Sequence, residues 1–141
     1  MNVSEVMTTD VNSCTPESSL EEVAQKMKEI EVGVVPVCDQ GKLKGLVTDR
    51  DIVVKGLAEQ LPSNAKVSEV MTTEQITGTQ DMSVEEAARL MSDHQIRRLP
   101  IMENDKLVGI VSLGDLAVEH PSNDKIGRVL EEVSHPAKPN Q

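Results

Sequence analysis

Apolar residues recur at helical spacing in two matching segments of the chain. Residues 20–30 and 84–91 place an apolar side chain every three or four positions, which gives each segment one apolar stripe. Ser19 and Ser83 directly precede these segments, and each stands three residues before a glutamate, the pattern of a capping box. We therefore predict one amphipathic helix in each half, with its methionines in the core rather than against a ligand.

Shorter apolar runs separated by a polar turn follow each predicted helix. They cover residues 34–38 and 43–47 in the first half and residues 99–102 and 107–111 in the second. Two such runs around a turn predict a β-hairpin. Pro36 and Pro100 lie inside the first strand of each hairpin, and proline cannot donate a hydrogen bond to a ladder. We expect that side of the strand to be an edge, or an opening that a ligand can occupy.

The sequence also repeats itself at a fixed offset. Residues 3–9, Val-Ser-Glu-Val-Met-Thr-Thr, return unchanged as residues 67–73, which is an offset of 64 positions (67 − 3). The same offset aligns the capping serines and the strand prolines, so the chain is a tandem duplication. The predicted parts are a first domain at residues 1–62, a second at residues 63–120 and a C-terminal segment at residues 121–141.

Each copy is expected to form a helical turn, a strand, a helix, two strands and a helix, which is an α/β fold. A copy of this size has too little core to stand alone, so we predict that the two copies pack sheet to sheet. The further predicted elements are a helical turn over residues 3–7, short strands near residues 13–15 and 76–79, helices over residues 51–58 and 115–120, a final helix over residues 125–133 and a disordered tail over residues 135–141.

A hydroxyl and a carboxylate follow the second hairpin strand in both copies, always three residues apart. They are Thr48 with Asp51 and Ser112 with Asp115. A strand that feeds a helix here puts both side chains at the helix N-terminus, where backbone N–H groups point outward, so such a corner can hold a phosphate and a sugar. The same spacing fits a capping box that stabilises a helix by about 1 kcal/mol with no ligand. Both interpretations stay open at this point.

Charge and composition narrow the ligands that such a corner can take. The formal net charge is −10, which repels nucleic acid and anionic membranes. No Phe, Tyr or Trp is present, so an adenine must lie between aliphatic side chains. Arg97 and Arg98 are two adjacent cations beside the second proline-bearing strand. They either bind a small anion or pair with surface carboxylates, which adds little to stability.

Other features argue against several classes of protein. The 141 residues contain no apolar run of membrane-spanning length and no signal-peptide pattern, so we expect a soluble cytoplasmic protein. Cys14 and Cys38 are expected to be free thiols. The histidines and cysteines lack metal-ligand spacing, and no nucleophile motif is present, so we predict neither a metal site nor an enzyme.

The repeated pattern resembles the CBS domain, the module named for cystathionine β-synthase, in its usual tandem pair. The resemblance spans residues 3–119. It rests on the repeated Val-Ser-Glu-Val-Met-Thr, the proline-bearing strands and the glycine-to-aspartate stretches 45–51 and 109–115. Proteins similar in this way form a pseudo-twofold pair with two clefts and regulate rather than catalyse. The resemblance implies an adenosine-containing regulatory ligand such as AMP, ADP, ATP or S-adenosylmethionine, with no cofactor required.

The resemblance also implies roles for individual residues. Asp51 and Asp115 would accept hydrogen bonds from ribose hydroxyls, and Thr48 and Ser112 would contact ribose or phosphate. The adenine edge would be read by backbone beside Pro36 and Pro100 and around residues 13–15 or Thr77 to Thr79.

The two clefts are not expected to be equivalent. The first copy has Gly33-Val34 where the second has Arg97-Arg98, and Arg50 stands where the second has Gly114. We expect a phosphate-bearing ligand to favour the cleft that holds Ser112 and Asp115, with Arg97 or Arg98 on the phosphate.

Three classes of function follow. The first is a nucleotide sensor whose ligand shifts the geometry between the copies and so alters an unidentified protein partner. The second is an assembly module that dimerises through its terminal helices without a ligand, and an enzyme is a distant third. We expect a homodimer, with no nucleic acid and no membrane as partner.

Overall fold

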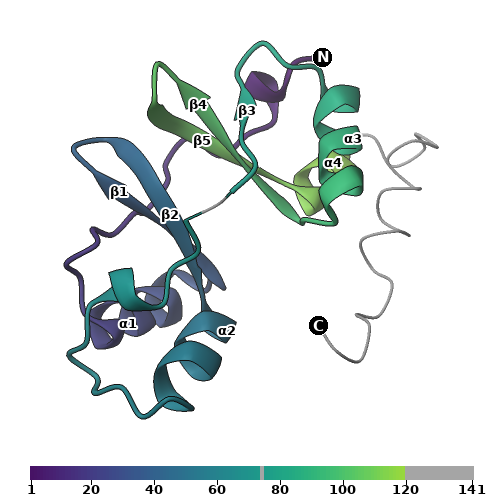
Figure 1. The fold of residues 1–141 in the computed structure, drawn as a ribbon. Coiled ribbons are helices and arrows are strands. Elements are labelled where there is room, and N and C mark those ends of the chain that lie inside the picture. Colours follow the sequence, from purple (N-terminus) through teal and green to yellow (C-terminus); the bar gives the residue numbers. More distant parts are fainter. Residues whose placement is uncertain (74, 120–141) are drawn as a thin grey trace. The chain divides into compact units, whose positions relative to one another are not determined.

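The computed structural model describes residues 1–73 and 75–119, and the side chains within that range up to residue 116. Its elements in chain order (Figure 1) are the 3-10 helix η1 (Val3–Glu5), helix α1 (Leu20–Ile30), strands β1 (Val34–Asp39) and β2 (Lys42–Thr48), helix α2 (Asp49–Asp51), the π-helix η2 (Ile52–Leu57), the 3-10 helix η3 (Val67–Glu69), strand β3 (Gly78–Thr79), helix α3 (Val84–His94), strands β4 (Arg98–Glu103) and β5 (Lys106–Ser112) and helix α4 (Leu113–Glu119). The predicted helix over residues 125–133 and the predicted tail over residues 135–141 lie outside the described residues.

The predicted helices over residues 20–30 and 84–91 are confirmed as α1 and α3, and both start where the capping serines indicate. Ser19 Oγ accepts a hydrogen bond from the Glu22 N–H, and Ser83 Oγ accepts one from the Glu86 N–H, each at 3.1 Å. Both helices end at a residue in the left-handed conformation, Glu31 after α1 and Gln95 after α3. Local sequence therefore determines where these helices begin.

The predicted hairpins are confirmed as β1–β2 and β4–β5. β1 runs antiparallel to β2, with Val35 opposite Val47. Gln40 and Gly41 both have positive φ in the turn of the first hairpin. Asn104 and Asp105 do the same in the second, as a two-residue type I′ turn requires.

The chain divides into two compact units that do not coincide with the two sequence repeats. The first unit comprises Asn12–Gln75 with Asp105–Leu107, and the second comprises Met1–Val11, Ile76–Asn104 and the described residues from Val108 onward. The N-terminal segment of each repeat is thus part of the unit that holds the rest of the other repeat. The predicted boundary between residues 62 and 63 describes the two sequence repeats and stays a prediction. The predicted packing of one copy on the other also stays a prediction.

The exchanged segments contribute buried side chains to the cores that receive them. Val67 and Val70 of the η3 region are at most 1% exposed and lie in the core of the first unit with residues from α1, β1 and β2. Val3 of η1 is fully buried in the core of the second unit with residues from α3, β4, β5 and α4. The exchange is also fixed by backbone bridges, Leu46 to Thr72 in the first unit and Thr8 to Ile110 in the second.

The edge or opening predicted on one side of each proline-bearing strand is not found, because a short parallel segment pairs with that side of the strand. In the first unit, Cys14 N donates to Pro36 O at 2.9 Å and Cys38 N donates to Cys14 O at 2.8 Å. A parallel bridge of this form uses the carbonyl of Pro36 and never its missing N–H, so proline is compatible with it. The predicted strand near residues 13–15 is reduced to this one bridge at Cys14. β3 forms the matching pair with β4, Gly78 opposite Ile101.

Candidate functional site

The first corner is the turn from β2 into α2, where Thr48 and Asp51 bind each other reciprocally. Thr48 N donates to Asp51 Oδ2 at 3.0 Å, and Asp51 N donates to Thr48 Oγ1 at 3.0 Å. Both side chains are partly buried. The helix therefore begins at Asp49, two residues before the predicted start, because Thr48 caps it.

The second corner is the turn from β5 into α4, and it repeats that geometry. Ser112 N donates to Asp115 Oδ2 at 3.1 Å, and Asp115 N donates to Ser112 Oγ at 3.0 Å. α4 accordingly begins at Leu113 rather than at the predicted residue 115. The capping-box interpretation of both corners is confirmed as geometry. It leaves one carboxylate oxygen and the hydroxyl proton of each corner outside the cap.

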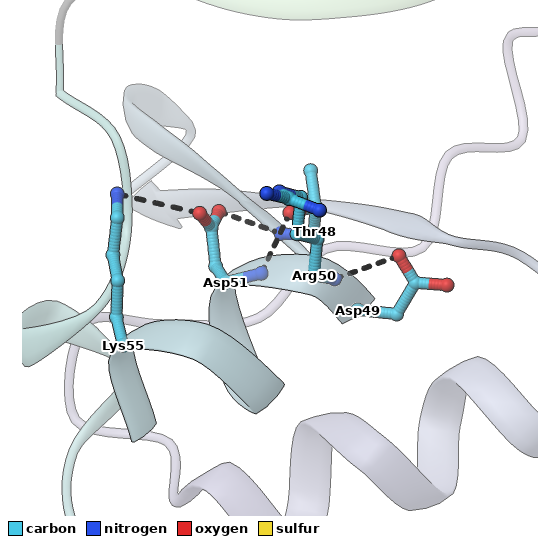
Figure 2. Close-up of polar contacts among 5 residues, drawn as sticks. All are labelled: Thr48, Asp49, Arg50, Asp51 and Lys55. Carbon is cyan, nitrogen blue, oxygen red and sulfur yellow. Dashed lines mark hydrogen bonds and ion pairs between the residues drawn. The ribbon is translucent and has the colours of Figure 1, made fainter. Parts of the chain in front are cut away.

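Lys55 completes the first corner and was absent from the sequence-based set of site residues. Its Nζ lies 3.3 Å from Asp51 Oδ1, so the carboxylate is contacted from two sides, by Lys55 and by the Thr48 N–H (Figure 2). Arg50 lies between them in sequence, is exposed, and donates its backbone N–H to Asp49 Oδ1 at 2.8 Å. The i, i+4 spacing of Asp51 and Lys55 is the sequence signal that would have found this pair.

The start of the first hairpin strand reaches each corner through one backbone hydrogen bond. Asp49 N donates to Gly33 O at 3.0 Å in the first unit, and Leu113 N donates to Arg97 O at 2.8 Å in the second. This bond brings the backbone of Arg97 to the second corner. A Cβ added at Gly33 would lie 3.3 Å from Asp49 Oδ2. The first corner thus has an acid, Asp49, at the position where the second corner has Leu113.

Arg97 and Arg98 are exposed, and in the described part of the chain neither guanidinium has an ion-pair partner. The alternative that they merely neutralise surface carboxylates finds no support among those residues. An exposed guanidinium group without an ion-pair partner among those residues can bind an oxyanion, because it presents a fork of N–H donors.

The structure does not bring every predicted site residue to a corner. Pro36 and Pro100 are buried in β1 and β4. Thr79 pairs with Met102, near the opposite end of β4 from Arg98, and its hydroxyl donates to Asp81 Oδ1 at 2.8 Å. Thr77 precedes β3 and is exposed, and among the described residues no hydrogen bond joins it to the second corner.

The backbone expected to read an adenine in the first copy already has partners. Lys26 Nζ donates to Ser13 O at 2.7 Å, and Thr15 N donates to Ser18 Oγ at 3.1 Å. Cys14 uses both its N–H and its carbonyl in the bridge to β1. Its side chain is 6% exposed, and this burial raises the pKa of the Cys14 thiol to about 11.

Cys14 and Cys38 are both free thiols, as the sequence predicted. No group of three or more His, Cys, Asp or Glu side chains is arranged to hold a metal ion within residues 1–73 and 75–116. No helix among the described residues is long and apolar enough to cross a membrane.

An apolar groove lies between α1 and η2 in the first unit, apart from the corner. It has a volume of about 360 Å³ and is lined by Leu20, Glu21, Ala24, Ile52, Val53, Leu57, Leu61 and Ser63. Leu57 is 73% exposed and Val53 is 54% exposed. Two large apolar side chains on one helix are thus left facing solvent.

Known proteins share this sequence and this architecture. A curated relative, the CBS domain-containing protein YhcV of Bacillus subtilis, is 48% identical over 134 residues, covering 95% of this chain and 96% of its own. Hypoxic response protein 1 of Mycobacterium tuberculosis is 36% identical over 84% of this chain and 85% of its own. The crystal structure of Hypoxic Response Protein I, with two coordinated zinc ions, matches with a TM-score of 0.77 at 35% identity over 84% of this chain and 98% of its own.

Two further solved structures contain adenosine derivatives. CBSX2 in complex with AMP matches with a TM-score of 0.76 at 25% identity, covering 85% of this chain and 96% of its own. The CBS domain pair of protein MJ0100, in complex with 5′-methylthioadenosine and S-adenosyl-L-methionine, matches with a TM-score of 0.76 at 27% identity, covering 86% of this chain and 96% of its own.

The family profile described as "CBS domain" matches twice, at residues 3–56 and at residues 67–120. The two matches repeat the duplication seen in the sequence, and each ends just beyond one of the two hydroxyl and carboxylate corners. This α/β chain with its two repeats therefore belongs to the CBS domain family, as a tandem pair.

Proposed function

We propose that this chain is a regulatory module that binds an adenosine-containing ligand at its two corners and signals to a protein partner. The observation that carries the proposal is the reciprocal hydroxyl and carboxylate pair, built twice with nearly the same geometry. The AMP and S-adenosyl-L-methionine complexes of structurally similar CBS pairs support the same class of ligand.

Each corner offers groups suited to a nucleotide. The carboxylate oxygen outside the cap accepts a hydrogen bond from a ribose hydroxyl, and the Thr48 or Ser112 hydroxyl donates to ribose or phosphate. Arg97 and Arg98 add a phosphate site at the second corner. An adenine packs between aliphatic side chains, because the chain has no Phe, Tyr or Trp. The proposal includes no catalytic step and no required cofactor, and it places the protein in the cytoplasm.

Thermal unfolding in the presence of candidate ligands tests this proposal. A ligand at a hundredfold its Kd stabilises the folded state by about 2.7 kcal/mol, which circular dichroism detects as a higher Tm. Tryptophan fluorescence is not an option, because the chain has no Trp. If adenosine, AMP, ADP, ATP, NAD and S-adenosylmethionine all leave Tm unchanged, and the purified protein carries no adenine absorbance band, the proposal is wrong.

Substitution of the two aspartates separates binding from capping. We expect Asp115→Ala to weaken adenosine-ligand binding in calorimetry beyond its loss of about 1 kcal/mol of stability as a cap, and Asp51→Ala tests the first corner in the same way. Ser83→Ala is the matched control, because it removes a capping side chain of the same repeat away from the corner. Unchanged affinity in both aspartate variants would mean that the corners only cap helices.

The apolar groove favours a second candidate function, a homodimeric assembly module. Leu57 and Val53 expose large apolar side chains beside this groove, and contiguous exposed apolar surface marks interaction sites. We expect Leu57→Asp to shift the protein toward monomer in light scattering after gel filtration. A mass that is the same for both proteins would remove this support.

A further inference from the structure

Lys55 distinguishes the two corners, although their hydroxyl and carboxylate residues match. In the first corner, Asp51 Oδ2 accepts the Thr48 N–H at 3.0 Å, and Asp51 Oδ1 lies 3.3 Å from Lys55 Nζ. Both carboxylate oxygens are therefore engaged (Figure 2), and the Asp51 side chain is only 13% exposed. A new donor must share or displace one of these two partners.

The second corner presents its carboxylate differently. Asp115 Oδ2 accepts the Ser112 N–H at 3.1 Å, as in the first corner, but Asp115 has no ion-pair partner among the described residues. The sequence position that matches Lys55 is Glu119, an acid rather than an ammonium group. Among the described residues, no cation has to be displaced before a ligand reaches Asp115 Oδ1.

We infer that Lys55 weakens the first corner for the ribose of its ligand, so that the second corner fills first. This inference rests on the proposed function, in which the same aspartates accept ribose hydroxyls. A ribose hydroxyl reaches Asp51 Oδ1 only by sharing this oxygen with the Lys55 ammonium group or by displacing that group, so the weakened ion pair offsets part of the gain from the new hydrogen bond. Lys55 thus acts as a built-in competitor for Asp51 Oδ1.

The size of the effect follows from the exposure of the pair. The Lys55 side chain is 50% exposed, so solvent screens the ion pair. Pairs of this kind are worth about 0.2–1 kcal/mol, which corresponds to a change of about 1.4–5-fold in Kd. Removal of the ammonium group should therefore tighten ribose binding at the first corner by that factor.

A different role for Lys55 predicts the opposite result. If its ammonium group turns to the phosphate of a bound nucleotide, removal of Lys55 weakens nucleotide binding. Adenosine has no phosphate, so its affinity reports the competition for Asp51 alone. Adenosine is therefore the probe, and AMP is measured alongside it.

The experiment measures adenosine affinity by calorimetry in an Asp115→Ala background, where only the first corner keeps its carboxylate. Lys55→Met is compared with Lys44→Met, which removes one exposed positive charge from the same unit at a residue without an ion pair among the described residues. We expect Lys55→Met to tighten adenosine binding by about 1.4–5-fold and Lys44→Met to leave it unchanged. The difference should shrink at about 1 M salt, where ion pairs are screened.

Several results would overturn the inference. They are unchanged or weaker adenosine binding in Lys55→Met, or an equal gain in Lys44→Met. Binding that stays undetectable in the Asp115→Ala background with either residue at position 55 would do the same. If Asp115→Ala does not fold, the same comparison is made in an Asp115→Asn background, which also removes the carboxylate of the second corner. Wild-type protein that binds no adenosine ligand would instead refute the proposed function, so the two failures are distinguishable.

Discussion

Gly45→Ala should destabilise the protein more than Gly109→Ala, although the two glycines occupy matching positions in the two repeats. Both are buried, and each lies where the exchanged N-terminal segment crosses its hairpin strand. A Cβ on Gly45 would lie 2.5 Å from the backbone O of Thr72. A Cβ on Gly109 would lie 2.6 Å from Met7 Sδ, near the end of a flexible side chain, and 3.0 Å from the backbone O of Thr8.

The magnitude follows from what must move. Thr72 O would have to retreat by at least 0.5 Å (3.0 − 2.5) to reach even a tight contact of 3.0 Å. Thr72 O accepts from Leu46 N at 3.0 Å and Thr72 N donates to Leu46 O at 2.8 Å, so the retreat stretches the bridge, and both of its hydrogen bonds are at risk. Each such bond contributes about 1 kcal/mol net, so Gly45→Ala should cost roughly 2 kcal/mol or more. Met7 can rotate away, so Gly109→Ala should cost less than about 1 kcal/mol.

Urea unfolding followed by circular dichroism measures both free energies of unfolding, since the chain lacks the aromatic residues that fluorescence requires. Equal costs for the two variants would refute the reasoning, because they would show that the backbone at Thr72 yields as readily as the Met7 side chain. A larger cost for Gly109→Ala than for Gly45→Ala would also refute the reasoning.

Three further predictions concern the whole chain, one thiol and the two arginines. Residues 1–62 and 63–141 expressed separately should each be unstable, because each lacks a segment that the core of its unit needs, and a cooperative thermal transition in either fragment alone would contradict this. Burial raises the pKa of Cys14 from 9.0 to about 11, so between these pH values the unfolded chain releases a proton that the folded chain keeps. The free energy of unfolding should therefore fall by roughly 2 kcal/mol from pH 9 to pH 11, and Cys14→Ala should lose this part of the slope. The Arg97→Ala, Arg98→Ala double variant should bind adenosine normally but lose its preference for AMP and ATP, and a preserved preference in calorimetry would show that neither arginine contacts phosphate.

Local features of the fold could be predicted from the sequence, but its long-range exchange could not. Ser19 and Ser83 mark the helix starts because a capping hydrogen bond involves residues three apart. Val3 and Val67 stand in identical segments, so nothing in either segment tells which core it joins. That choice depends on the lengths of chain that connect the segments, and the structure assigns each valine to the unit of the other repeat.

The candidate site shows the same division. The hydroxyl and carboxylate pairs could be predicted because their geometry is local. Lys55 was not predicted as a site residue, despite its helical spacing from Asp51. Thr79 was expected at the ligand, but the register of β3 places it beside Met102. Strand register between distant segments depends on tertiary packing, so a sequence pattern alone does not determine it.

The exchange of N-terminal segments also affects how the protein is made. Val3 belongs to a core that includes Leu116, so the second unit is incomplete until the ribosome has added more than a hundred further residues. At about 5–20 residues per second this takes roughly 6–23 s, during which the N-terminal segment lacks the core that it joins in the finished fold. On crowded polysomes that segment can be captured by the second repeat of a neighbouring nascent chain, because the two chains have the same sequence. Growth at high expression levels should therefore favour intertwined dimers over monomers.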